Sequence, residues 1–352
     1  MKKSLIVLLV ATFFGSLNAY TITATPAPVE INNYTLLPDT NVIIPPLYEQ
    51  LPDNEKKNII TVLTVDGGGM HGIIPLKVLE QIEGKSKMPI SSLFDFMGGT
   101  STGAIIASSL AMPDKDGKPQ YTASQVLSNY KTDGKKIFKR DLMHSISTLF
   151  GFYGPHLPRK NIDQIMSERF GDTTLKNLLS HVIIPCGLLI DYAPYWFKTH
   201  HAQQDENKNF YVKDAVLAAT ATPDLFAPYP LFNTKKNWSD YGIDAGIFVN
   251  NPTAQILLDL HLLYPDKKFF IVSLGTLQAA ENEQLKNPKK YSHLGIINGI
   301  FPIIETSAVF SVQLTDMQIA NIANSTNSTI MGYVRINIIP KKNTTSVFSA
   351  DK

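Results

Sequence analysis

NIITVLTVDGGGMHGIIPLKVLEQIEGKSKMPISSLFDFMGGTSTGAIIASSLAM, residues 58–112, contains two glycine-rich turns, each placed between a predicted strand and a predicted helix. Ile59 to Val65 is an apolar, β-branched run of strand length that ends at a glycine cluster. Apolar residues then recur at three- and four-residue spacing, which predicts a helix with one buried face: Leu76, Val78, Leu79 and Ile82. The segment therefore predicts a strand–loop–helix unit of an α/β domain.

The two turns predict one catalytic site. Gly67, Gly68 and Gly69 lack a Cβ, so their backbone can approach a ligand closely, and the helix that follows offers free N–H groups to an anion. Gly99-Thr-Ser-Thr-Gly103 matches G-x-S-x-G, the sharp turn that exposes a serine hydroxyl. We expect Ser101 to be a nucleophile that faces an oxyanion hole.

The pairing of the two motifs makes the signal specific. G-x-S-x-G alone arises by chance in roughly one chain in ten of this length. The nearby Asp66-Gly-Gly-Gly69 makes coincidence much rarer, although glycine turns also serve as plain strand–helix connections.

Four motifs in order along the chain resemble the patatin-like phospholipase family. They run from about residue 58 to Thr276 and comprise Asp66–Gly72 with Ile73-Ile-Pro75, Gly99–Gly103, Ala218–Pro223 with Phe226-Ala-Pro228, and Asp244-Ala-Gly246 with Asn250-Asn-Pro252. The resemblance implies a three-layer α/β/α sandwich with a central, mostly parallel sheet, a patatin-like variant of the hydrolase fold. The alternation of predicted strands and helices independently indicates α/β architecture.

The same resemblance implies a Ser–Asp dyad, with Ser101 as nucleophile and Asp244 as general base. It assigns the oxyanion hole to the amides of Gly67, Gly68 and Gly69. A carboxylate can activate a serine if burial raises its basicity and it contacts the hydroxyl. The implied function is a lipid acyl hydrolase of phospholipase A type, which acts through an acyl-serine intermediate on membrane or micellar lipid. No cofactor or metal is expected, because the sequence lacks a calcium loop with closely spaced acidic ligands.

A histidine-based triad is the competing arrangement. In the usual Ser–Asp–His order a histidine follows the aspartate, and only His261 and His293 do so here. Asp66 is a less favoured base, since its place at a strand end suits bracing the glycine loop.

Two residues depart from the family pattern. His71 stands where the family usually carries arginine, so fixed positive charge beside the loop is lost at neutral pH. Ala245 stands where glycine more often follows the aspartate, so the placement of the base is expected to differ slightly.

The chain divides into four predicted parts. Residues 1–19 have a basic start, a short apolar run and small residues near Ala19, which is typical of a secretory signal peptide and predicts a secreted or periplasmic protein. An uncleaved anchor is the alternative. Residues 20–57 form an extended lead-in, residues 58–280 a catalytic domain, and residues 281–352 a helical completion with a polar tail.

Composition excludes several classes of protein. The chain has 352 residues, of which 44% are hydrophobic and 18% charged, so it is globular rather than disordered. A net charge of +2 argues against nucleic acid as the main partner. Cys186 is the single cysteine and is expected in the core.

Two questions stay open at the level of sequence. Lys131, Lys135 and Lys136 lie on a predicted helix over residues 121–138, where a solvated face is favoured and attraction to anionic lipid headgroups is the alternative. For the whole chain, the alternatives to a hydrolase are a phosphotransferase with two phosphate loops, which lacks the Walker lysine, and a storage or binding protein with a residual site.

Overall fold

The structure is a computed structural model that describes residues 58–138, 147, 154–276, 296–325 and 328–340, together with three short strands before them. These strands are β1 (Val29–Ile31), β2 (Tyr34–Leu36) and β3 (Val42–Ile43). The predicted signal peptide over residues 1–19 lies outside the described residues. The divisions at residues 57 and 280 stay predictions.

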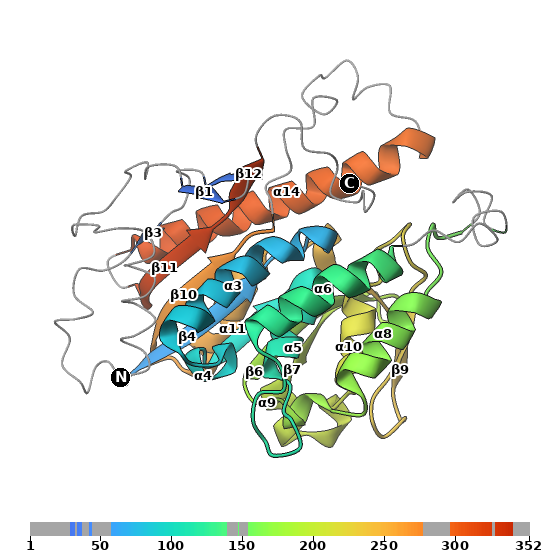
Figure 1. Ribbon diagram of the computed structural model, residues 1–352, viewed down its shortest axis with the longest axis horizontal. Helices are drawn as coiled ribbons and strands as arrows, with labels where there is room; N and C mark the ends of the chain where they lie inside the picture. Colours follow the sequence, from blue (N-terminus) through green and yellow to red (C-terminus); the bar gives the residue numbers. More distant parts are fainter. Residues whose placement is uncertain are drawn as a thin grey trace.

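A nine-stranded mixed sheet forms the centre of the molecule (Figure 1). Its strands follow the order β3-β11-β10-β4-β5-β6-β9-β8, and β7 also pairs with β6. The parallel strands are β11 (Ile330–Ile336), β10 (Lys268–Leu274), β4 (Ile59–Val65), β5 (Phe96–Gly99) and β6 (His181–Leu188). Two strands pair antiparallel with β6, namely β7 (Ala193–Lys198) and β9 (Ser239–Asp244), and β8 (Tyr229–Phe232) pairs antiparallel with β9. The mostly parallel sheet predicted from the sequence is confirmed.

Strand β4 shows why the domain has three layers. Its side chains alternate between the two faces of the sheet, as the two-residue period of a strand requires. Leu63 and Val65 join one apolar core, whereas Ile60 and Val62 join a second core on the opposite face. A strand buried on both faces is continuously apolar, which is the pattern that the sequence shows.

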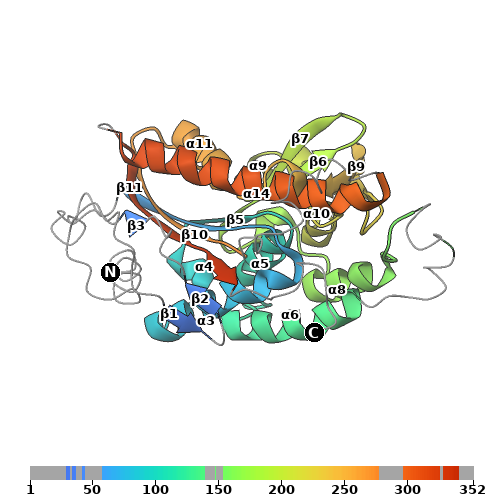
Figure 2. The ribbon, with the colours of Figure 1, turned by 90° about the horizontal axis from the view of Figure 1, so that it is seen from above.

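Helices cover both faces (Figures 1 and 2). One face carries α3 (Ile73–Ser86), α5 (Thr102–Ala111), α6 (Ala123–Ile137), α8 (Lys160–Phe170) and α10 (Val212–Ala219). The other face carries α11 (Thr253–Leu263) and the long α14 (Ile296–Ala323). Shorter helical segments are η1 (Gly69–Gly72), α4 (Ile90–Leu93), η3 (Leu175–Asn177), α9 (Thr199–Gln204), η4 (Glu206–Lys208) and η5 (Ala245–Ile247). The three-layer sandwich is thereby confirmed.

Two details complete the architecture. β12 (Ile338–Pro340) joins β1 and β2 in a small three-stranded sheet. Across the part of the chain that the structure describes, none of the helices combines the length and apolarity needed to cross a membrane.

Candidate active site

Ser101 lies on a sharp turn between β5 and α5. Its backbone has a φ of 53° and a ψ of −115°, a conformation that a non-glycine residue rarely adopts and that marks a functional constraint. A Cβ on Gly103 would collide with the Val65 carbonyl, and one on Gly99 would collide with the backbone of Gly103. The glycines of G-x-S-x-G therefore let the turn press against β4, which leaves the serine at the N-terminus of α5.

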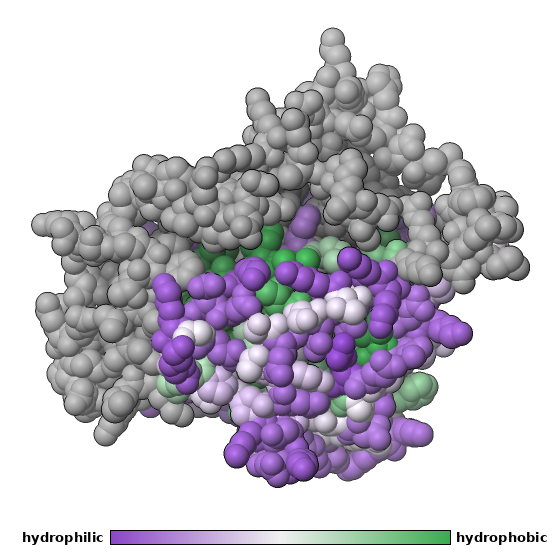
Figure 3. Space-filling model, viewed as in Figure 1, coloured by the Kyte–Doolittle hydropathy of each residue, from purple (hydrophilic) through white to green (hydrophobic). Residues whose placement is uncertain are grey.

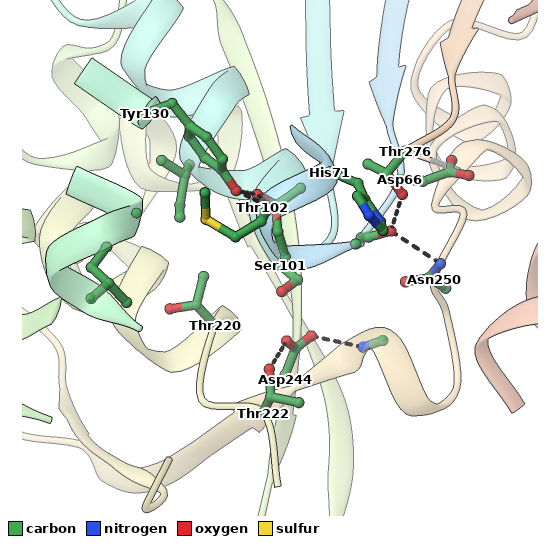
Figure 4. A pocket seen from close by; sticks show the side chains of 18 of the residues that line it. Asp66, His71, Ser101, Thr102, Tyr130, Thr220, Thr222, Asp244, Asn250 and Thr276 are labelled. Carbon is green, nitrogen blue, oxygen red and sulfur yellow. Dashed lines mark hydrogen bonds between the residues drawn. The ribbon is translucent and has the colours of Figure 1, made fainter. Parts of the chain in front are cut away.

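Asp244 faces Ser101 from the end of β9 (Figure 4). The aspartate is 3% exposed, and it accepts hydrogen bonds from Thr222 Oγ1 at 2.7 Å and from the Gly246 N–H at 2.8 Å. Burial raises the pKa of the Asp244 carboxyl, while the hydrogen bonds from Ser101, Thr222 and Gly246 act in the opposite direction. Asp244 is therefore a stronger base than an exposed aspartate, and it is held in one orientation beside the serine.

The glycine loop after β4 is held by bonds to its carbonyl groups. The Gly67 carbonyl accepts from Thr276 Oγ1 at 2.5 Å and from Asn250 Nδ2 at 3.3 Å. Because a trans peptide is planar, with its N–H opposite its C=O, these bonds turn the N–H of Gly68 away from Thr276. The Gly67 N–H donates to the Asn250 carbonyl at 3.1 Å, so Gly67 is not a free donor for an oxyanion.

The next peptides of the loop are fixed in the same way. His71 N–H donates to the Gly68 carbonyl at 3.1 Å. The Gly69 carbonyl accepts from Thr102 Oγ1 at 2.9 Å and from the Tyr130 hydroxyl at 2.5 Å. Within the described residues no hydrogen bond occupies the N–H of Gly68 or Gly69. The expected oxyanion hole is therefore narrowed to these two glycines.

His71 lines the cavity beside this loop (Figure 4). Burial lowers the pKa of its imidazole, so the side chain is neutral at pH 7. This agrees with the expected loss of fixed charge where the family carries arginine.

A buried ion pair between Asp66 and Arg335 supports the start of the glycine loop. Asp66, the last residue before the glycines, accepts two hydrogen bonds from Arg335 of β11, at 2.9 Å to Nη1 and 2.5 Å to Nη2. Both side chains are almost completely buried. Burial raises the pKa of Asp66 to about 6, and the charge of Arg335 acts against that rise. Asp66 therefore braces the loop, as expected, with a partner that the sequence does not indicate.

Helix α14 holds the segment that links Asp244 to the glycine loop. Three hydroxyls spaced four residues apart along one face of the helix bind the backbone of residues 247–251. Ser307 Oγ donates to the Ile247 carbonyl at 2.5 Å, and Thr315 Oγ1 donates to the Asn251 carbonyl at 3.2 Å. Between them, Ser311 Oγ accepts from the Asn250 N–H at 2.9 Å. Asn250 in turn binds Gly67, so α14 is connected to the glycine loop through one residue.

Ser101 and Asp244 open into a mainly apolar cavity with two walls. One wall comes from α5, α6, α8 and the segment after α10, and the other from α14. The first wall is lined by Ile105, Val126, Tyr130, Ile137, Ile162, Met166, Phe170, Leu225 and Phe226, and the second by Ile304, Glu305, Ala308, Val309, Val312 and Gln313. Such a cavity suits a hydrocarbon chain attached to a polar reacting group.

The model of the patatin-like phospholipase family matches residues 63–257, which include the glycine loop, Ser101 and Asp244. The chain belongs to this family. Its members are serine lipid acyl hydrolases, so the chain is a serine carboxylic ester hydrolase by family.

Plant relatives show the same similarity over most of the chain. Patatin-like protein 2 of Arabidopsis thaliana is 27% identical over 79% of this chain and 75% of its own. Patatin-like protein 4 of the same plant is 27% identical over 64% of this chain and 61% of its own. Patatin group J-1 of Solanum tuberosum is 24% identical over 77% of this chain and 74% of its own.

The structure does not place His261, the histidine of the alternative triad, at the candidate site. That residue is exposed on α11 and does not line the cavity. His293 lies outside the described residues. Cys186 is buried in β6, as expected, and burial raises the pKa of its thiol. Among the described residues no cluster of His, Cys, Asp and Glu has the geometry to hold a metal ion.

Three parts of the site were not predicted. Thr222, whose hydroxyl donates to Asp244, lies in the quoted Ala218–Pro223 motif, and this hydroxyl could have been recognised from the sequence as a partner for a buried carboxylate. Arg335 and the hydroxyls of α14 approach from distant sequence, and no local pattern marks them.

Proposed function

We propose that the chain is a secreted lipid acyl hydrolase of phospholipase A type, which cleaves carboxylic esters of phospholipids or related glycerolipids through Ser101 and Asp244. The carrying observation is that the Ser101 side chain faces a buried carboxylate inside an apolar cavity, next to two free glycine amides. The signal-like residues 1–19 support the secreted location.

The first half-reaction forms an acyl-enzyme. Ser101 Oγ attacks the ester carbonyl carbon while Asp244 takes the hydroxyl proton. The carbonyl oxygen becomes an oxyanion, which the N–H groups of Gly68 and Gly69 and the N-terminus of α5 stabilise. The intermediate then collapses, the bond to the alcohol oxygen breaks, and Asp244 returns the proton to that oxygen so that the lysolipid leaves.

The second half-reaction releases the fatty acid. Asp244 removes a proton from water, the resulting hydroxide attacks the acyl carbon, and the proton goes back to Ser101 Oγ as the ester bond breaks. The apolar walls hold the acyl chain in both steps, which keeps the carbonyl carbon beside Ser101.

The competing functions have less support. Family membership and the serine–aspartate pair favour ester hydrolysis over phosphate transfer. A phosphate loop of the Walker type needs a lysine that this chain lacks, whereas a glycine loop that binds an oxyanion does not. A storage or binding protein would not require a carboxylate with a raised pKa held against a serine.

The test is fatty-acid release from phosphatidylcholine in mixed micelles. We expect Ser101→Ala to lose at least about a thousandfold in rate. Ser109→Ala changes another serine that lines the cavity on α5, and it should keep the wild-type rate within a few fold. Full activity of Ser101→Ala, or no ester hydrolysis by folded wild type, would overturn the proposal.

A further inference from the structure

The long helix α14 has two apolar faces with different surroundings. Its inner face lines the active-site cavity through Ile304, Ala308, Val309 and Val312. Its outer stripe consists of Ile303, Phe310, Leu314 and Met317, which follow one another at spacings of seven, four and three residues and so share one side of the helix. Their side chains are 54%, 64%, 56% and 64% exposed, respectively. A helix that is apolar on both faces is normally buried in protein or in lipid. A stripe of large exposed apolar side chains on a folded domain marks an interaction surface.

The outward direction of the stripe is fixed. The bonds from Ser307, Ser311 and Thr315 to residues 247–251 set the rotation of α14 about its axis. Near its C-terminal end the helix is anchored by Ile319, which is fully buried in the core beside α11. The hydroxyls and Ile319 therefore hold the inner side on the protein, and they leave the stripe facing outward.

The few charged residues of α14 indicate which kind of surface its outer stripe can contact. Residues 296–323 contain no lysine and no arginine, and their only charged residues are Glu305 and Asp316. Glu305 lines the cavity, and Asp316 binds Asn251 and Arg335 on the protein side. The outer stripe is therefore uncharged. It matches a surface that offers apolar contact without requiring anionic groups.

We propose that the outer stripe of α14 docks on a lipid surface with zwitterionic or neutral headgroups, with the helix lying along the interface. The proposal rests on the proposed function, because a glycerolipid substrate is presented in such a surface. One helix then both contacts the lipid and forms a wall of the cavity that receives the acyl chain. An interfacial helix of this kind lies in the headgroup region and does not cross the bilayer.

Helix α6 provides a contrasting surface on the other side of the sheet. Lys131, Lys135 and Lys136 are exposed on it, and the face that carries α3, α6 and α8 is largely hydrophilic (Figure 3). Docking through these lysines would require anionic lipid and would weaken with salt. Docking through the stripe of α14 requires neither condition.

The experiment compares four full-length proteins. The test protein carries Phe310→Gln, Leu314→Gln and Met317→Gln, and a matched control carries Ile190→Gln, Phe232→Gln and Tyr241→Gln, which change apolar residues of similar exposure at the β6–β9 side of the sheet. The fourth protein, beside wild type, carries Lys131→Gln, Lys135→Gln and Lys136→Gln. Each is sedimented with vesicles of phosphatidylcholine alone and with phosphatidylglycerol added, and each is assayed on a soluble short-chain ester that needs no interface.

We expect the α14 variant to partition onto phosphatidylcholine vesicles about tenfold less than wild type, because three apolar side chains no longer leave water. The matched control and the lysine variant should partition like wild type, and added phosphatidylglycerol should change little. All four proteins should hydrolyse the soluble ester at similar rates. If wild type does not hydrolyse the soluble ester, the proposed function is refuted. The docking proposal is then still tested by vesicle binding, which is measured separately.

Three results would overturn the docking surface. Partition of the α14 variant onto phosphatidylcholine vesicles to the same extent as wild type would show that the stripe does not contact the lipid. Binding of wild type to anionic vesicles only, abolished in the lysine variant, would assign docking to α6. A wild-type dimer in lipid-free buffer that the α14 variant converts to a monomer would assign the stripe to self-association.

Discussion

The two walls of the cavity differ in both origin and outer surface. The wall built from α5, α6 and α8 lies within the residues that the family model matches, and its outer side is hydrophilic. The wall built from α14 lies beyond those residues, and its outer side is apolar and uncharged. Ser101 and Asp244, the proposed reacting groups, thus belong to the part shared with the family. The α14 and β11 segments add supporting contacts from outside that part, through Ser311 to Asn250 and through Arg335 to Asp66.

The largest effect is expected in the family part of the site. Asp244→Asn should lower kcat/KM for an ester by about a thousandfold, since the general base is lost. Asp172→Asn, which changes an exposed carboxylate, should leave kcat/KM unchanged. An Asp244→Asn enzyme that keeps more than about a tenth of wild-type kcat/KM would remove Asp244 from the chemistry.

The same substitution should stabilise the fold at neutral pH. The pKa of Asp244 is raised by folding, so the folded state holds the proton more tightly, and the stability contributed by the protonated form is lost as pH rises through the raised pKa. Removing the buried charge should therefore increase the free energy of unfolding at pH 7 by about 1 kcal/mol, as measured in urea. A decrease would show that the bonds from Thr222 and Gly246 outweigh the burial of the charge.

The next effect compares the ion pair that supports the glycine loop with an ion pair on the first wall. Arg335→Met leaves Asp66 buried without its partner, so the free energy of unfolding should fall by roughly 3–5 kcal/mol. Arg169→Met breaks a more exposed pair with Asp133 on the first wall, and about 1 kcal/mol is expected there. Both changes in the free energy of unfolding are to be measured by urea titration. Adding Asp66→Asn to Arg335→Met should restore part of the loss, and equal losses for the two single variants would contradict the assigned role of Arg335.

The same contrast explains what could be predicted from sequence. Strand β4, the turn at Ser101 and helix α11 follow from local rules, because glycine placement and apolar periodicity act over a few residues. The pairing of Ser101 with Asp244 came from the family resemblance rather than from spacing. The Asp66–Arg335 pair joins residues 269 positions apart, and nothing local to either residue indicates the other.

The oxyanion loop shows a finer limit. The family resemblance implies an oxyanion hole from the amides of Gly67, Gly68 and Gly69 without choosing among them, but the Gly67 N–H donates to the Asn250 carbonyl. Which amides stay free depends on the carbonyl partners Thr276, Tyr130 and Thr102, which come from three different elements. Those partners are set by tertiary packing and not by the glycine pattern.

The pH dependence of activity should follow Asp244. Because burial raises its pKa, the acid limb of kcat/KM is expected above the ordinary aspartate value of about 3.9. Each pH unit below the limb should lower activity about tenfold, since only the carboxylate acts as base. The limb should be the same in His71→Asn. A limb at or below about 4, or one that disappears in that variant, would point to a different titrating group.

The last effect concerns the hydroxyls of α14, which act on the glycine loop through Asn250. Ser311→Ala removes the acceptor of the Asn250 N–H, so we expect a loss of about 1 kcal/mol in the free energy of unfolding and a severalfold fall in kcat, because Asn250 positions Gly67. Ser325→Ala, near the end of the same helix and without a contact to this loop, is the matched control. A fall in stability with kcat unchanged would separate the packing of α14 from the geometry of the loop.

Covalent labelling by a fluorophosphonate probe, with the adduct located by peptide mass mapping, tests the central claim most directly. The probe is applied to wild type, Ser101→Ala, Asp244→Asn and His261→Ala, each checked for folding by circular dichroism. The serine–aspartate account predicts an adduct on Ser101 in wild type and in His261→Ala, none in Ser101→Ala, and strongly slowed labelling in Asp244→Asn. Loss of labelling in folded His261→Ala, or no labelling of folded wild type with or without lipid micelles, would contradict it.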